Sequence, residues 1–265
     1  MSHGQTSTQA TSIGVRDCKL SILFFISRLH NFTRRFFTTV LAGSAGPSDV
    51  AHLDIRSKFT KVYEHNVFGG SESRSGEGSN LKQTSVIRVE VPKLIAELGV
   101  GTLLDAPCGD WHWMRETKLG VPNYIGVDIV APMIQRNTEM YGSEGVRFLC
   151  VDIAKDELPK ADLILTRDCL VHLSFEDAFR VLANFRRTGA MYLLATTFVE
   201  RAYNDDLDAR FWRPLNMQAP PFNFPAPLRV INEQCSEGGG AFVDKSLGLW
   251  KLRDVPAFER PSEQS

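Results

Sequence analysis

Cysteine is scarce in this chain of 265 residues, and its few copies are far apart. The five cysteines are an odd number and include no Cys-x-x-Cys pair. This spacing argues against a disulfide framework and against a cysteine-rich zinc site, so we predict no metal site and favour a reducing compartment. We expect Cys108, Cys150 and Cys169 to act as small buried side chains.

Long hydrophobic runs and an excess of one charge are also missing. The apolar run at residues 20–26 is far shorter than the roughly 18 to 20 residues that span a bilayer, so no transmembrane span is predicted. With 30 Lys and Arg against 31 Asp and Glu, the chain has no overall field to attract nucleic acid, which we do not expect as a partner. The composition, 43% hydrophobic and 23% charged, is that of a folded protein.

The first 48 residues differ from the rest because they carry five basic residues and one acidic residue. Three interpretations remain open: a dispensable extension, an organelle-targeting leader, and a segment that lies on a membrane surface. We therefore expect a soluble protein, and the sequence does not decide between the cytoplasm and an organelle. We predict a basic extension at 1–48, a helical and Gly/Ser-rich lead-in at 49–100, and the main domain at 101–256.

The lead-in contains a Gly/Ser-rich segment at 68–80, which we interpret as a loop or flexible linker. A lid that closes over a ligand is the alternative, since Glu72 and Arg74 lie within it. Apolar positions at helical spacing follow at 84–98, where Pro92 indicates either a break or the first turn of a new helix.

Short β-branched runs then alternate with helical stretches. The helices are expected after Trp111 and at 132–141 and 174–187, the last with Ser174 as its N-cap. The strands are expected at 102–105, 124–128, 146–152, 161–166 and 190–197, followed by an antiparallel hairpin of 228–235 and 246–252. We therefore predict an α/β fold, a Rossmann-like, doubly wound, mostly parallel seven-stranded sheet with a C-terminal antiparallel hairpin. The aromatic, Pro-rich segment 211–227 is either a lid that forms an acceptor wall or a cover over the sheet edge.

Three expected strands end in an acidic residue, namely Asp105, Asp128 and Asp152. Ligands of parallel α/β sheets bind at the carboxyl ends of the strands, so these carboxylates are candidate binding groups. Asp128 follows Gly109 by 19 residues, the distance at which dinucleotide folds hold ribose hydroxyls. The three-glycine diphosphate fingerprint is missing, however, and Asp105 would repel phosphates. The pocket therefore favours a ligand with a positive centre, and a nicotinamide enzyme is disfavoured.

The segment Leu-Leu-Asp-Ala-Pro-Cys-Gly at 103–109 resembles the first motif of the class I S-adenosylmethionine-dependent methyltransferases, and the resemblance extends over about 103–198. It is strongest to small bacterial-type members with Asp-Ala-Pro-Cys-Gly-Asp and Arg-Asp-Cys-Leu-Val-His-Leu motifs. Trp111 departs from the pattern, since many members have a third glycine there. The Asp/Asn-Pro-Pro-Tyr/Phe motif of the enzymes that methylate DNA adenine or protein amides is also missing.

The resemblance implies S-adenosyl-L-methionine as cofactor. Its amino-acid end would lie at Asp105 and the Gly109 turn, its ribose at Asp128, and its adenine at Asp152 and Ile153. The full set of cofactor-binding residues that we predict is Asp105, Pro107, Cys108, Gly109, Asp110, Asp128, Ile129, Asp152, Ile153 and Arg167.

Asp168 and His172 are the candidate catalytic residues, because they are four residues apart and would share one face of a helical turn. A structural Asp with a hydrogen-bonded His is the alternative. In the catalytic interpretation one of them is the base, and Asp168 fixes the tautomer of His172. The predicted function is in-line methyl transfer to a small-molecule acceptor, with O-methylation favoured. A non-catalytic cofactor-binding or assembly module is the competing hypothesis, and the oligomeric state stays open.

Overall fold

The computed structural model describes residues 1, 53–207 and 211–258. The chain divides into two units, Met1–Ala42 and Gly43–Ser265, and the fold described below belongs to the second. The basic extension predicted at 1–48 lies outside the described residues except for Met1. Of the helices that the structure describes, none combines the length and the apolar character needed to cross a membrane.

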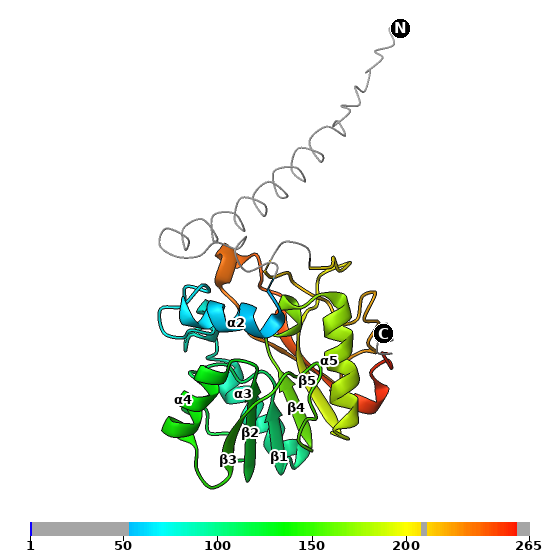
Figure 1. The fold of residues 1–265 in the computed structure, drawn as a ribbon. Coiled ribbons are helices and arrows are strands. Elements are labelled where there is room, and N and C mark those ends of the chain that lie inside the picture. The colour runs from blue at the N-terminus through cyan, green and yellow to red at the C-terminus, as the bar shows by residue number, and fades with distance from the viewer. Residues whose placement is uncertain (2–52, 208–210, 259–265) are drawn as a thin grey trace, which may run out of the picture. The chain divides into compact units, whose positions relative to one another are not determined.

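Seven strands form one mixed sheet in the order β3-β2-β1-β4-β5-β7-β6 (Figure 1). β1 to β5 are parallel, whereas β7 runs antiparallel between β5 and β6. The predicted α/β fold with a C-terminal antiparallel hairpin is therefore confirmed, and β7 is the hairpin strand that joins the parallel part. The strands are β1 Thr102–Asp105, β2 Asn123–Asp128, β3 Val146–Cys150, β4 Leu163–Thr166, β5 Tyr192–Phe198, β6 Arg229–Asn232 and β7 Lys245–Lys251.

Four α-helices are described. They are α2 Ile55–Glu64, α3 Ile87–Leu98, α4 Ala131–Tyr141 and α5 Phe175–Arg187. Ser174 caps α5 as predicted, since its hydroxyl accepts a hydrogen bond from the Asp177 N–H. The break expected at Pro92 does not occur. α3 continues through Pro92 because buried side chains on both sides of it, including Val91 and Leu94, hold the helix against the sheet.

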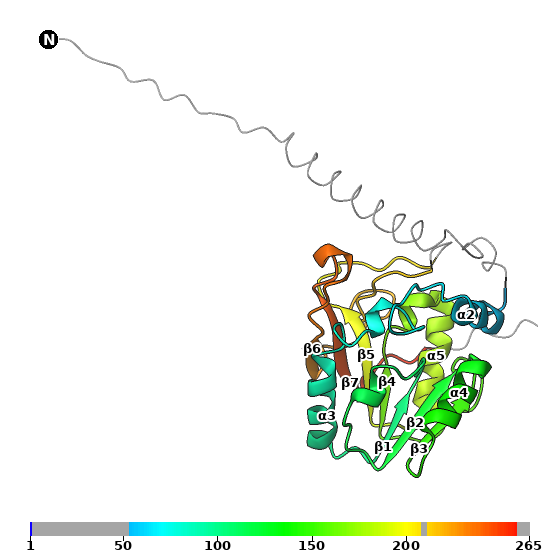
Figure 2. The same cartoon turned by 90° about the vertical axis from the view of Figure 1, so that its left-hand side faces the viewer.

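Both faces of the sheet are covered, because successive strand residues point to opposite sides. Leu104 belongs to a cluster of buried residues with α5, and Leu103 to a second cluster with α3. Figure 2 shows α3 and α5 on opposite sides of the sheet. α4 packs beside β2 and β3. The arrangement leaves the carboxyl ends of the parallel strands open at one edge of the sheet.

The prediction of a helix after Trp111 is wrong, because only the 3-10 turn Met114–Glu116 forms there. Gly109 and Trp111 have φ angles of 57° and 58°, which a right-handed helix does not accept. The Trp111 ring instead packs against Tyr124, at 5.6 Å between ring centroids, and against Phe148, at 5.3 Å. Packing of this large side chain thus takes the place of a helix between β1 and β2.

Candidate functional site

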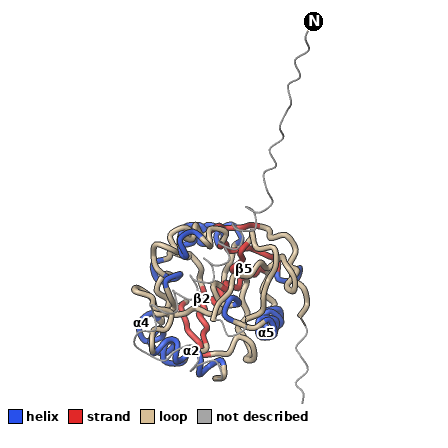
Figure 3. The backbone as a smooth tube through the Cα atoms, turned by 90° about the horizontal axis from the view of Figure 1, so that it is seen from above, coloured by secondary structure: helices blue, strands red, loops and turns tan. Residues whose placement is uncertain are grey.

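A cavity opens at the carboxyl ends of the parallel strands and contains about 1180 Å³ of space, its open mouth included. α2 lies over these strand ends, between α4 and α5, as the view from above shows (Figure 3). The structure places every sequence-predicted site residue in the lining: Asp105, Pro107, Cys108, Gly109, Asp110, Asp128, Ile129, Asp152, Ile153, Arg167, Asp168 and His172. Asp152 lies two residues beyond the end of β3 rather than closing that strand.

The turn after β1 is fixed to both neighbouring strands. Its Ala106 N–H donates to Leu165 of β4, and its Cys108 N–H donates to Val127 of β2, each at 2.8 Å. Gly109 is required in this turn because its φ is positive and because a Cβ there would overlap the hydroxyl of Ser75. The turn can therefore approach the Gly/Ser-rich segment closely.

Asp110 attaches the Gly/Ser-rich segment to this turn. Its carboxylate accepts hydrogen bonds from the Ser73 hydroxyl and from the Arg74 N–H, both at 2.8 Å. Ser73 is buried, and Arg74, Ser75 and Ser79 line the cavity. The flexible-linker interpretation of this segment is therefore wrong, because the segment is a packed wall of the cavity.

The three acidic strand ends keep unused lone pairs. Asp128 accepts from the N–H groups of Gly109 at 3.2 Å and Val130 at 3.1 Å, and burial raises its pKa to about 6. Burial raises the pKa of Asp105 to about 7, although the Tyr124 hydroxyl donates to it at 2.6 Å. Asp152 accepts from the Ala154 N–H at 3.0 Å. Each carboxylate has about four lone-pair positions, so all three can accept further hydrogen bonds from a ligand.

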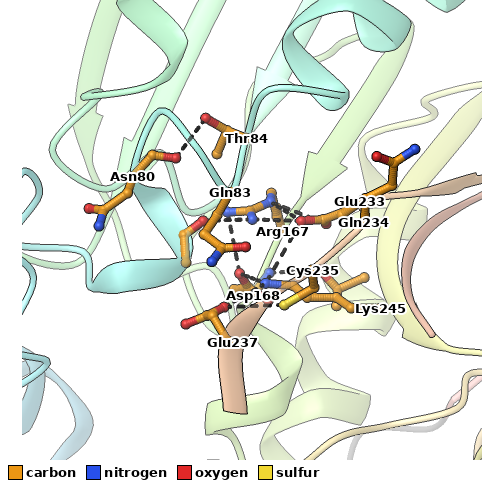
Figure 4. A network of polar contacts seen from close by, with 12 residues as sticks. Asn80, Gln83, Thr84, Arg167, Asp168, Glu233, Gln234, Cys235, Glu237 and Lys245 are labelled. Atoms are coloured by element: carbon orange, nitrogen blue, oxygen red, sulfur yellow. Dashed lines mark hydrogen bonds and ion pairs between the residues drawn. The ribbon is translucent and has the colours of Figure 1, made fainter. Parts of the chain in front are cut away.

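Arg167 belongs to a buried ion network that joins β4 to the C-terminal hairpin (Figure 4). Its guanidinium pairs with Glu233 at 2.7 Å and also donates to the Gly78 carbonyl at 2.8 Å. Lys245 of β7 pairs with Asp168 at 2.6 Å. Burial opposes the charge on Asp168, but Lys245 and Arg167 outweigh it and lower the pKa of Asp168 to about 2. The Oδ1 atom of Asp168 is buried and has no hydrogen-bond partner among the described residues.

His172 does not pair with Asp168 as the spacing predicted. Its Nδ1 lies 2.6 Å from the carbonyl oxygen of Phe211, while Asp168 is held by Lys245. Asp168 has a φ of 52°, so the backbone from Asp168 to His172 is not one continuous helical turn. The prediction that Asp168 fixes the tautomer of His172 is therefore wrong. The backbone carbonyl of Phe211 fixes the tautomer instead. Burial lowers the pKa of His172 to about 4, so the ring is neutral at pH 7.

The apolar wall of the cavity was not predicted from the sequence. Most of its residues come from α2, whose inner face is apolar at helical spacing but carries no functional motif. The wall consists of Ile55, Phe59, Val62, Tyr63 and Phe68. Of the two alternatives for segment 211–227, the acceptor wall is wrong, because its described side chains do not line the cavity. Leu215, Met217 and Phe222 are fully buried beside α5 instead.

The cysteines near the cavity have different surroundings. Cys108 and Cys169 are buried, as expected, whereas Cys150 is exposed. Burial raises the pKa of Cys169 to about 12, which leaves its thiol protonated at pH 7. Within the described ranges, no group of three or more His, Cys, Asp and Glu side chains is arranged to hold a metal ion.

Comparison with known proteins gives a partial sequence match. No protein-family model matches the chain. Over 97 residues the chain is 29% identical to proteins named as uncharacterized methyltransferases from Mycobacterium bovis and Mycobacterium tuberculosis. The match covers 36% of this chain and 47% of each relative, so it spans about half the length of those relatives.

Solved structures are similar at lower sequence identity. The 1,6-didemethyltoxoflavin-N1-methyltransferase of Burkholderia thailandensis is 18% identical with a TM-score of 0.49, over 79% of this chain and 92% of that one. An N-methyltransferase from Bradyrhizobium japonicum is 13% identical with a TM-score of 0.42, over 52% and 73% of the two chains. The sheet order is that of a Rossmann-like α/β fold, and over 97 residues the chain is similar to proteins named as uncharacterized methyltransferases.

Proposed function

We propose that this protein transfers a methyl group from S-adenosyl-L-methionine to a small-molecule acceptor. One observation carries the proposal: Asp105, Asp128 and Asp152 follow three strands of one sheet and line a single cavity. That cavity offers acidic groups to a cationic ligand, and its turn lacks the glycines that a diphosphate requires. The bound cofactor supplies an activated methyl group on a sulfonium.

The chain's own residues suit the parts of this cofactor. Asp105, whose pKa burial raises to about 7, would gain most from a cationic neighbour such as the ammonium or sulfonium. Asp128 has free lone pairs for two ribose hydroxyls, and Asp152 and Ile153 would border the adenine. Arg74 also lines the cavity, where its guanidinium donates to the Tyr63 and Glu64 carbonyls, and it would be a candidate partner for the cofactor's carboxylate.

In the proposed reaction the protein mainly orients the acceptor and excludes water. For a hydroxyl acceptor, the cofactor would supply the methyl group, and Nε2 of His172 would hold the hydroxyl and accept its proton. A ring with a pKa of about 4 is a weak base, so His172 would orient the hydroxyl and then release the proton to solvent. Because His172 can accept a proton from a hydroxyl, the proposal includes O-methylation.

The competing proposal, a binding module without catalysis, draws its support from Trp111 in the place of a glycine. The Trp111 ring lies 5.0 Å from that of Tyr141, in an aromatic cluster with Tyr124 and Phe148, and it is not part of the cavity lining. The tryptophan therefore leaves room for the cofactor.

Two measurements on the full chain test the proposed function. Calorimetry should show binding of S-adenosylmethionine and S-adenosylhomocysteine, and none of NAD at the same concentration. Release of S-adenosylhomocysteine should then appear when a panel of small hydroxyl and amine compounds is added. Binding without release for any acceptor would favour the module, and tighter binding of NAD would contradict both hypotheses.

A further inference from the structure

We propose that the cavity takes, beside the cofactor, an acceptor with a flat apolar body and one hydroxyl or N–H group that donates a hydrogen bond to Nε2 of His172. The inference rests on the proposed function and specifies the acceptor that this site selects. Two features of the cavity carry it: the fixed tautomer of His172 and the aromatic rings around it.

The tautomer of His172 follows from its partner. A carbonyl oxygen only accepts hydrogen bonds, so the 2.6 Å contact with Phe211 requires the proton to be on Nδ1. Because the ring is neutral, Nε2 then carries a lone pair and no proton. None of the described residues is hydrogen-bonded to Nε2, and His172 lines the cavity. The position therefore accepts a hydrogen bond and cannot donate one.

Aromatic rings surround this acceptor atom. The Phe68 ring lies 5.1 Å from the imidazole at an interplanar angle of 35°, and the Phe59 ring lies 6.4 Å away and nearly perpendicular. Ile55 and Val62 of α2 extend the same apolar wall. Planar apolar groups gain most from such a surface, since aromatic pairs prefer offset and edge-to-face contacts at these distances.

The lone pair on Nε2 disfavours an acceptor group that has no hydrogen to donate. A carboxylate or an ether oxygen next to Nε2 would bring its own lone pairs against that of the nitrogen. The charge of Asp168 does not decide the choice, because Asp168 is paired with Lys245 at 2.6 Å and with Arg167 at 3.3 Å. A group that donates a hydrogen bond satisfies the position.

Three naphthalene derivatives test this selectivity on the full chain saturated with S-adenosylhomocysteine. 2-Naphthol has the donor, 2-methoxynaphthalene has the same body without it, and 2-naphthoate carries an anion. We expect 2-naphthol to bind about threefold to tenfold more tightly than 2-methoxynaphthalene, the range of one hydrogen bond, and also more tightly than 2-naphthoate, which has no hydrogen to donate. Titration calorimetry or the fluorescence of the naphthyl group measures the three dissociation constants.

Two variants separate the hydrogen bond from the apolar wall. In His172→Phe, 2-naphthol and 2-methoxynaphthalene should bind equally, because the ring stays but the lone pair is lost. In Phe59→Ala, both should bind several-fold more weakly while their ratio is kept. The nitrogen-15 shifts of His172 give a measurement without substitution, and a proton on Nε2 would overturn the proposal.

The outcomes distinguish this inference from the proposed function. Calorimetry with S-adenosylhomocysteine on the same samples reports the cofactor site and the fold of each variant. If the cofactor product binds but none of the naphthalenes does, or if the preference for 2-naphthol survives in His172→Phe, the acceptor inference fails alone. If S-adenosylhomocysteine does not bind, the proposed function fails first.

Discussion

At the scale of the residue, Asp128 is the most direct test of the cofactor site. Replacing it in Asp128→Ala should weaken the affinity for S-adenosylmethionine by about 1 to 3 kcal/mol, because charge-assisted hydrogen bonds to the ribose are lost. Calorimetry on the purified variant measures the change. The carboxylate also accepts from two backbone N–H groups, so the substitution disturbs the turn as well as the cavity.

Asp162 provides the matched control for this backbone effect. It also accepts from two backbone N–H groups, those of Gly101 at 2.9 Å and Thr102 at 2.8 Å, but it lies before β4 and outside the cavity lining. Asp162→Ala should therefore reduce stability without changing the affinity for the cofactor. Equal losses of affinity in the two variants would remove Asp128 from the ribose role.

The raised pKa of Asp105 predicts that cofactor binding depends on pH. Burial raises its pKa to about 7 and that of Asp128 to about 6, so below pH 6 both are mainly uncharged. A cationic ligand binds the ionised form more tightly, and the affinity for S-adenosylmethionine should rise from pH 5.5 to 8 with release of protons. In Asp105→Asn this rise should become shallower. Calorimetry in buffers of different ionisation enthalpy counts the protons, and an affinity independent of pH would contradict the prediction.

At the scale of the element, the parallel strands were predictable because their apolar runs are bounded by glycine, proline or acidic residues. The connection from β1 to β2 was not predictable, because its backbone conformation depends on the packing of Trp111 against aromatic rings that are distant in the sequence. Pro92 shows the same limit, because tertiary contacts of α3 outweigh a local helix breaker. Local propensity fails here where a few long-range contacts are strong.

The C-terminal hairpin is joined to the cavity through Glu233, whose side chain is only 1% exposed and pairs with Arg167. Glu233→Gln should lower the free energy of unfolding by on the order of 3 kcal/mol, because it leaves a buried guanidinium with one anionic partner fewer. Glu97→Gln is the control. It breaks the pair with Arg229 of β6, where both side chains are about half exposed, and should cost about 1 kcal/mol or less. Urea unfolding compares the two, and equal losses would argue against the network as a stabilising element.

At the scale of the whole molecule, the candidate site was predictable to the extent that sheet geometry alone creates it. Parallel strands present their carboxyl ends at one edge, so Asp105, Asp128 and Asp152 converge without any knowledge of side-chain packing. The α2 wall and the Phe211 carbonyl could not be found in this way. Phe211 is 39 residues from His172 along the chain, and no periodic pattern connects them.

Cofactor binding should also stabilise the folded chain as a whole, because the site combines residues from the ends of several strands and so exists only in the folded state. At a free concentration 100 times the dissociation constant, a ligand that binds only the folded state adds about 2.7 kcal/mol. For a domain of this size that corresponds to a rise in Tm of about 5 to 11 °C. Calorimetric scans with S-adenosylhomocysteine should show this rise, and scans with NAD should not. In Asp128→Ala at the same ligand concentration the rise should shrink, whereas in Asp162→Ala it should persist above a lower starting Tm. A full rise in Asp128→Ala would mean that the ligand is held elsewhere than at the acidic strand ends.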